Sequence, residues 1–431
     1  MNTTPDNYRA ALATTLEQDA DAGYPRWVKE ARSAALQKFL DEGFPHVKLE
    51  NWRYTNLAPM AERIGVSVSE SVRSNEPALP ASDADAITLV FVNGLFSAKR
   101  SSLKSLPAGV VVGNLASQLE NEDTDKLLSV VPGNSSLAQL NSAMVSDGAV
   151  LRIPDNIELP HAVHIVYSNT TAANVFPRVT VQLGRNAKAT VIEHHISNGA
   201  CVSAAVTNLE CADGAQLCYQ KLQEESAESY HVAVQNISLA KDSRCDIVNI
   251  DLGAAIGRND LRILLQGSGA EAHINGLFLV DGARLTDNHL HLEHQAPHTS
   301  SRAHYAGVVA NKGRGVFNGM IHVTQAAQKT DAALYNKNLL LTEGAEIDTK
   351  PELEIYADDV KCAHGSTTGQ LDAGSLFYLR TRGVPEQAAR NMLVQAFATE
   401  VVQQLATEAL RNYVLNSVEQ RLNEFGAVVE A

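Results

Sequence analysis

Four segments in the middle of this chain share one pattern, a small polar turn followed by an alternating strand. A second strand lies between successive turns, since Asn208 and Asn236 occupy matching places 28 residues apart. A fixed period with two short strands per unit is typical of a solenoid whose coils stack on one another, whereas a sandwich would not keep a constant step. The segments are GRNAKATVIEHH, ADGAQLCYQKLQ, AKDSRCDIVNID and GSGAEAHINGLF, which align on Ala187, Ala215, Ser243 and Ala270 in steps of 28, 28 and 27 residues.

The repeat divides the chain into three predicted regions. Residues 150–372 are expected to form a β-helix core. Residues 1–149 are expected to be mainly helical, over 5–45 and 115–146, with a small hairpin at Asn93-Gly94 and a loop over 67–86.

Residues 373–431 form a third, helical region. Its apolar residues recur in steps of four, which predicts two amphipathic helices that cover the core, and part of this surface is expected to close the end of the β-helix. The two sets are Leu393, Phe397, Val401 and Leu405, after Pro385, and Leu410, Val414, Val418 and Leu422.

A β-helix places its functional sites in predictable positions. Inward side chains stack and fill the interior, so sites are expected on a flank or at an end. Terminal strands lack a partner on one side and can be continued by a second chain. The natural expectation is an interaction scaffold.

The strongest candidate site lies at the end of the predicted β-helix, in EIYADDVKCAHGSTTGQLD at residues 354–372. Cys362 and His364 are two positions apart on an extended segment, so their side chains share a face. Thiolate and imidazole bind soft metals, but they supply only two of the usual four ligands. This half-site suggests a site shared with a partner chain. The alternative is a buried thiol beside a hydrogen-bonded histidine, with no metal role.

Two other candidates are weaker. A histidine-rich segment contains His289, His291, His294, His298 and His304, and His289 and His291 share a strand face with Glu293. That pair is a possible metal patch, although a ladder of polar residues on a flank explains it more simply. A β-helix carbohydrate-active enzyme is the alternative from another class, with Glu193, Glu210 and Asp251 as its candidate carboxylates.

Composition narrows the choice of partners and compartment. The formal net charge of −14 and the lack of a basic cluster argue against a nucleic-acid partner. No apolar run approaches a membrane span, the N-terminus does not resemble a secretory signal, and no P-loop motif occurs. Five scattered cysteines do not suggest disulfides, and Cys201, Cys211, Cys218 and Cys245 are expected to fill the core. We expect a soluble, cytoplasmic protein.

Three segments of the chain resemble the SufB/SufD family of iron–sulfur cluster assembly scaffolds. They are ENWRYTNL at 50–57, NKNLLLTEGAEIDTKPELEI at 336–355, and the long motif that starts at Glu354 and continues into FYLRTRGVPEQAARNMLVQAFATEV. The chain is closer to the SufD branch, because SufB has glutamates on both sides of the histidine, where this chain has Ala363 and Gly365.

The resemblance implies a mainly β fold, a right-handed parallel β-helix flanked by N-terminal and C-terminal helical regions. It also implies a non-enzymatic scaffold that pairs with a SufB-like paralogue through the β-helix, or with itself when isolated. His364 and Cys362 are then candidate ligands or iron-entry residues for a transient cluster shared with SufB, and no tightly bound cofactor is expected. The alternative within the family is a SufB-like or homodimeric scaffold that builds a cluster alone.

The resemblance further implies that the C-terminal helices dock a SufC-like ABC ATPase. The candidate contact residues are Arg380, Arg382, Pro385, Glu386, Leu393 and Phe397.

Overall fold

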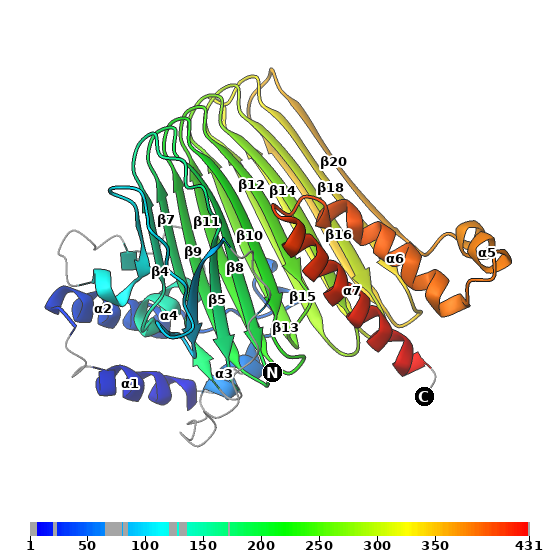
Figure 1. The fold of residues 1–431 in the computed structure, drawn as a ribbon, viewed down its shortest axis with the longest axis horizontal. Helices are drawn as coiled ribbons and strands as arrows, with labels where there is room; N and C mark the ends of the chain where they lie inside the picture. The colour runs from blue at the N-terminus through cyan, green and yellow to red at the C-terminus, as the bar shows by residue number, and fades with distance from the viewer. Residues whose placement is uncertain are drawn as a thin grey trace.

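The chain forms a two-sided parallel β-helix with helices packed on both outer faces (Figure 1). The computed structural model describes residues 7–19, 24–64, 80, 85–119, 127–128, 136–170 and 173–429. The strands form two ten-stranded sheets, which we call sheet A and sheet B, and from β7 onward successive strands alternate between them. The predicted mainly β fold and parallel β-helix are therefore confirmed.

Sheet A ends at β20 and sheet B ends at β19. In spatial order, sheet A contains β2 (Leu95–Phe96), β1 (Ile87–Val92), β5 (Val163–Asn169), β8 (Lys188–Ser197), β10 (Gln216–Glu224), β12 (Arg244–Asp251), β14 (Glu271–Val280), β16 (Ser300–Val309), β18 (Asp331–Leu340) and β20 (Lys361–Gly369). Sheet B contains β19 (Glu346–Ile355), β17 (Arg314–Val323), β15 (Leu285–His294), β13 (Ile256–Leu265), β11 (Tyr230–Leu239), β9 (Val202–Cys211), β7 (Arg178–Leu183), β4 (Ala149–Ile153) and β3 (Val111–Asn114), with β6 (Asn174–Val175) beside β9.

The repeat seen in the sequence corresponds to one coil of the β-helix. Asn208 in β9 lies directly opposite Asn236 in β11, one period later. The residue before each aligned turn position adopts a left-handed backbone, which Gly, Asn and Asp tolerate best. These residues are Asn186, Gly214, Asp242 and Gly269, with φ angles of 55°, 68°, 53° and 76°.

Helices cover the outer face of each sheet. Sheet B is covered near the start of the β-helix by α1 (Asn7–Asp19), α2 (Arg26–Glu42), α3 (Ala58–Ile64) and α4 (Ser136–Met144). Sheet A is covered over β8 to β16 by α6 (Glu386–Val402) and α7 (Glu408–Val429). In the part of the chain described above, no helix is both long and apolar enough to cross a membrane.

The segment ENWRYTNL fastens the N-terminal region to the outer face of sheet B. The guanidinium of Arg258 lies 3.7 Å from the centre of the Trp52 ring and donates to the carboxylate of Asp287 and the carbonyl of Asn51. Thr55 donates to the same carboxylate. Trp52 is 5% exposed, so it acts as a packing anchor.

The N-terminal predictions are confirmed in part. Residues 5–45 contain the two predicted helices α1 and α2, and Asn93-Gly94 joins β1 to β2 as the predicted hairpin. The helix predicted over 115–146 is wrong in extent, because in its described portion only α4 is α-helical, while Ala116–Gln118 and residues 127–128 are 3₁₀ turns. Most of the loop predicted over 67–86 lies outside the described residues.

The C-terminal prediction needs two corrections. α6 and α7 lie on the outer face of sheet A and do not close the end of the β-helix. The buried side of α6 contains Val394 and Ala398, whereas Leu393 and Phe397 are only partly buried. The later members of that set, Val401 and Leu405, are buried, as are all four residues of the second set. Leu393 and Phe397 lie at the rim of the buried side, because a step of four residues turns about 40° beyond one full turn.

Glycine at position 307 makes room for an aromatic ring inside the β-helix. A Cβ atom there would lie 2.3 Å from Cζ of Phe278, which is fully buried. We expect Gly307→Ala to lower the free energy of unfolding by about 1–3 kcal/mol, measured by urea denaturation. Gly369→Ala is the matched control, since nothing lies within 4 Å of its added Cβ. Equal stability of the two variants would contradict this packing.

Candidate functional site

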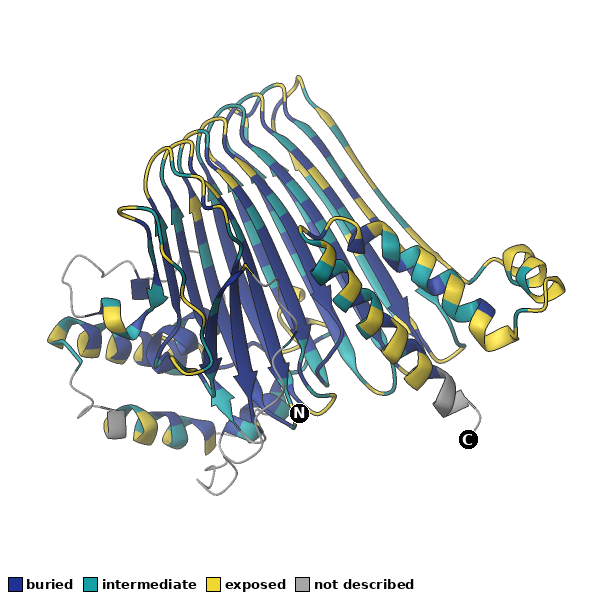
Figure 2. Cartoon of the chain, in the orientation of Figure 1, coloured by how far each residue is buried: buried dark blue, intermediate teal, exposed yellow. Residues whose placement is uncertain are grey.

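The last coil of the β-helix is open. β20 pairs with β18 on one side and β19 pairs with β17 on one side, so each terminal strand keeps a free edge. Figure 2 shows exposed and half-buried residues along these last strands, in contrast to the buried central strands. The free edges lie side by side, since β19 and β20 contact each other.

Cys362 and His364 both lie in β20, as the sequence predicted for an extended segment. Cys362 is opposite Ala332 and His364 is opposite Leu334, and both partners belong to the apolar core between the sheets. The two side chains therefore continue the inward ladder at the point where the core ends. Cys362 is half-buried against that core, while His364 is exposed. Burial raises the pKa of the Cys362 thiol.

Exposed apolar side chains concentrate in the last strands and the helices that follow them. Among the described residues, six of the ten exposed large hydrophobic side chains lie from position 335 onward: Tyr335, Ile355, Tyr356, Phe377, Tyr378 and Met392. Exposed apolar groups that gather at one place are typical of a surface that a partner covers.

The predicted contact residues for a second partner lie on and around α5 (Ala373–Thr381). Figure 2 shows α5 projecting from the body as an exposed helix, and no residue in it is buried. Arg380 pairs with Glu386 at 3.1 Å, and the Arg382 guanidinium lies 5.0 Å from the centre of the Tyr378 ring. Pro385 is the exposed N-cap of α6.

The histidine-rich segment does not form one site. His294 is buried between the sheets, with hydrogen bonds to Thr299 and Ser301, and His298 lies in a turn with φ of 58°. His304 lies on β16 within 3.9 Å of Glu400. These three residues are therefore separated from His289 and His291.

His289 and His291 line an open groove on the outer face of sheet B, next to Trp52 and Arg258. Nε2 of His289 lies 3.0 Å from Asp287, and Nε2 of His291 lies 3.6 Å from Glu293. Within the described ranges, no group of three potential metal ligands includes either histidine. A metal at this pair stays a prediction.

The carboxylates of the carbohydrate-enzyme alternative do not converge. Glu193 and Asp251 are buried between the sheets, whereas Glu210 is exposed on the outside of sheet B and accepts from Gln182. An acid/base pair needs two carboxylates on opposite sides of one accessible substrate. The structure therefore argues against this alternative.

The four other cysteines are free, and their surroundings differ. Cys211 and Cys245 fill the apolar core, as predicted. Cys218 is only partly buried, so its assignment to the core was wrong. Cys201 is buried beside Ser229, 3.4 Å from Sγ to Oγ, in a polar part of the interior. Burial raises the pKa of Cys201 and Cys211 to about 12.

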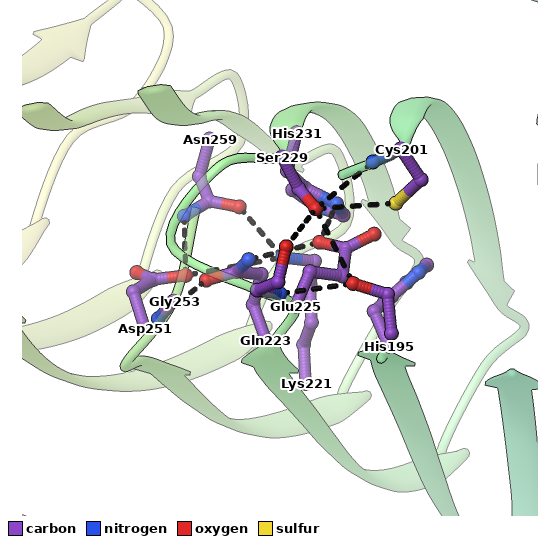
Figure 3. Close-up of polar contacts among 12 residues, drawn as sticks. His195, Cys201, Lys221, Gln223, Glu225, Ser229, His231, Asp251, Gly253 and Asn259 are labelled. Carbon is purple, nitrogen blue, oxygen red and sulfur yellow. Dashed lines mark hydrogen bonds and ion pairs between the residues drawn. The ribbon is translucent and has the colours of Figure 1, made fainter. Parts of the chain in front are cut away.

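That polar part of the interior is a site that the sequence analysis missed. It comprises His195, Glu193, Lys221, Gln223, Glu225, His231, Asn249, Asp251 and Asn259, all fully or almost fully buried. Figure 3 shows the part of this group around Glu225. The signal was present: steps of two from Val191, which faces the core, lead to Glu193 and His195. Charged residues at inward positions of a closed β-helix indicate a specific polar site.

The comparisons with known proteins agree with this fold. The model of the SUF system FeS cluster assembly SufBD core domain matches residues 166–397, and that of the SufBD protein N-terminal region matches residues 7–165.

Curated relatives cover most of the chain. The iron–sulfur cluster assembly protein SufD of Escherichia coli is 34% identical over 393 residues, 90% of this chain and 91% of that protein. A SufBD family protein of Synechocystis is 31% identical over 400 residues, 88% of this chain and 87% of that protein. SufD of Bacillus subtilis is 24% identical over 417 residues, 92% and 94% of the two chains. Two domain models that together match residues 7–397, and relatives above 30% identity over about 90% of the chain, establish that this chain belongs to the SufBD family of iron–sulfur cluster assembly proteins.

Proposed function

We propose that this chain is a SufD-like scaffold subunit of a SufB–SufC–SufD complex, with no catalytic turnover of its own. The observation that carries the proposal is the open end of the β-helix, where His364 continues the inward ladder and is exposed. A SufB-like paralogue would cover this end by adding its own strands to the free edges. The chain acts in the cytoplasm and holds a cluster only transiently.

His364 and Cys362 supply this subunit's share of the site. A neutral imidazole has a free lone pair for iron at neutral pH, whereas the thiol, whose pKa is raised by burial, releases its proton only when a metal displaces it. A metal of this kind usually has four ligands, so the partner would supply the remaining two. His364 is thus the first candidate for iron entry or cluster ligation, and Cys362 is the second.

The SufC-like ATPase would dock on α5 and the start of α6. The exposed fractions of Phe377 and Tyr378 are 70% and 57%, so two large apolar side chains lack cover in the isolated chain. Arg380, Arg382, Pro385 and Glu386 surround them, and Leu393 and Phe397 extend the surface along α6. Movement of the docked ATPase on nucleotide binding would act on the nearby edge strands.

We expect the double variant Phe377→Ala/Tyr378→Ala to weaken binding of the ATPase about 10-fold or more, because truncating buried aromatic anchors costs about 2 kcal/mol or more. Its melting temperature should equal that of the wild type, since both side chains are exposed. Titration of the purified ATPase by calorimetry measures the affinity. Leu103→Ala is the matched control, because Leu103 is 57% exposed far from α5. Equal affinity for all three proteins would remove α5 from the docking surface.

The second candidate within the family is a SufB-like or homodimeric scaffold that builds a cluster alone. The observation that favours it is the free edge itself, which a second copy of the chain could also cover. The experiment is anaerobic iron and sulfide loading of the chain purified alone, in parallel with the chain co-expressed with its SufB-like and SufC-like partners. The proposal predicts a stable cluster only in the co-expressed complex. A cluster of equal yield on the chain alone would favour the second candidate.

A further inference from the structure

Three potential metal ligands converge inside the β-helix, far from the residues assigned above to the cluster site. His195 comes from β8, Glu225 follows β10, and His231 comes from β11, so the group joins sheet A to sheet B. One ligand atom from each residue lies within 4.8 Å of the other two, and all three residues are 0% exposed. Figure 3 shows the three side chains close together beneath the turns that connect these strands.

Hydrogen bonds around His195 fix which nitrogen is available. Its Nε2 lies 2.7 Å from the carboxylate of Glu193, which also accepts from Thr207 and Tyr219. A carboxylate oxygen accepts this hydrogen bond, so Nε2 is the donor and Nδ1 is the nitrogen that can bind a ligand. Nδ1 is buried and has no hydrogen-bond partner. A carboxylate that orients a histidine in this way is typical of metal sites.

The two other ligands also have unused polar atoms. Oε1 of Glu225 is buried without a hydrogen bond, and Oε2 accepts from Gln223. Nε2 of His231 is buried without a hydrogen bond, and its Nδ1 lies 2.8 Å from Oε2 of Glu225. A buried polar group without a partner is unfavourable. Three such atoms in one cluster, Nδ1 of His195, Oε1 of Glu225 and Nε2 of His231, indicate that a ligand satisfies them.

The local charge favours a cation. Two buried carboxylates lie against the histidine rings, because Glu193 is 2.7 Å from Nε2 of His195 and Glu225 is 2.8 Å from Nδ1 of His231. Lys221 is the nearby cation, and its ammonium is directed to Asn259 at 2.9 Å and to Asp251 at 3.9 Å. The carboxylates beside the two histidines therefore have no bound cation of their own among the described residues.

We propose that His195, Glu225 and His231 bind one first-row divalent metal ion in the interior of the β-helix. Two imidazoles and one carboxylate suit Zn²⁺, Fe²⁺, Mn²⁺ and Co²⁺. Ligand atoms of a tetrahedral ion at about 2.1 Å are about 3.4 Å apart, and the three candidate atoms lie within 4.8 Å of one another, so the widest pair closes by up to about 1.4 Å around the ion. The ion would stabilise the junction between the first coils.

This interior site does not depend on the proposed role of the open end. Phe278, Val280 and Val309 form an apolar cluster between the sheets, in coils that lie between the buried ligands and β20. The added Cβ of Gly307 or Gly315 would lie within 3 Å of the Phe278 ring, which shows how closely this cluster is packed. The ion is accordingly a resident structural metal and not the cluster handled at the edge.

The test measures metal retained by the full-length chain. All proteins contain Cys362→Ala and His364→Ala, which removes the candidate ligands at the open end. The parent and the further variants Glu225→Gln and His231→Gln are produced in medium supplemented with Co²⁺ or Zn²⁺, washed with EDTA and analysed by mass spectrometry of the metal. His294→Gln is the matched control, because His294 is equally buried but both its nitrogens already have hydrogen bonds.

We expect about one metal ion per chain in the parent and the His294→Gln control, and at least about a tenfold lower content in the two ligand variants. No retained metal in the parent, or equal content in all four proteins, would overturn the proposal. If the ligand variants fail to fold, X-ray absorption of the loaded parent decides. Scattering from two imidazoles and a carboxylate supports the site, and a coordination shell without imidazole refutes it.

Discussion

Proline at position 368 is expected to weaken pairing of this chain with its SufB-like partner about 100-fold or more without unfolding the chain. Lys361 donates its backbone N–H to the carbonyl of Thr330 in the neighbouring coil. Every second residue of β20 from Lys361, including Thr367, therefore points its backbone N–H and C=O groups toward β18. The backbone groups of Thr368, the next residue, point the other way, so its N–H lies at the free edge of β20. Proline there removes a donor and places its ring where the added strand would lie, at a cost of about 3 kcal/mol.

The neighbouring position provides the control for this prediction. Thr367→Pro removes a hydrogen bond to β18, so it should destabilise the edge strand of the chain itself. Thr368→Pro should keep the wild-type melting temperature and lose the partner in size-exclusion chromatography and titration calorimetry. A Thr368→Pro protein that pairs with wild-type affinity would show that strand addition at β20 does not form the interface.

The free energy of unfolding is expected to fall strongly as the pH decreases from about 6.5 to about 4, above the range in which most carboxylates are protonated. Burial lowers the pKa of His164 to about 3 and that of His294 to about 4, because the interior disfavours the charged imidazolium. Both rings are neutral in the folded chain, whereas in the unfolded chain they bind protons below about pH 6.5. The unfolded state therefore binds more protons between about pH 6.5 and about pH 4, and stability falls as the pH decreases through this window.

Two additional protons on the unfolded chain give a slope of up to about 2.7 kcal/mol per pH unit. The loss between about pH 7 and about pH 4.5 is on the order of 5 kcal/mol, which is comparable to the whole stability of many domains. Urea denaturation over this range measures it. The double variant His164→Asn/His294→Gln should show a much flatter pH dependence, and a wild-type stability that does not change with pH would contradict the prediction.

The repeated coil and the shared strand face of Cys362 and His364 could be predicted from the sequence because they depend on local rules. A left-handed residue such as Asn186 or Asp242 marks each turn, and the period of two assigns each strand residue to a face. The same rule placed Cys362 and His364 on one face of β20, and the structure has them there.

The placement of the C-terminal helices could not be predicted in the same way. An amphipathic pattern shows that one side of a helix is buried, but not what covers it. α6 and α7 could have closed the last coil, and they cover sheet A because β8 to β16 present apolar residues on that outer face, such as Val248 and Leu277. The end of the β-helix remains open as a result.

The interior ligands illustrate a different limit. The inward position of His195 follows because it lies an even number of residues from the core residue Val191 on the same strand. The same holds for His231 and the core residue Ile237. Their approach to Glu225 depends on the path of the turn after β10, which the sequence pattern does not specify. Only the structure brings a turn residue of one coil together with strand residues from both sheets.

The most direct measurement of the proposed role is anaerobic cluster reconstitution on the complex of this chain with its SufB-like and SufC-like partners. Wild type, His364→Ala and Cys362→Ala are compared, with complex assembly checked by size exclusion and bound iron and sulfide counted for each. We expect all three complexes to assemble, iron incorporation to collapse in His364→Ala, and a smaller loss in Cys362→Ala. If both variants assemble and load iron as well as the wild type, the open end does not contribute ligands, and this subunit serves only to hold its partners together.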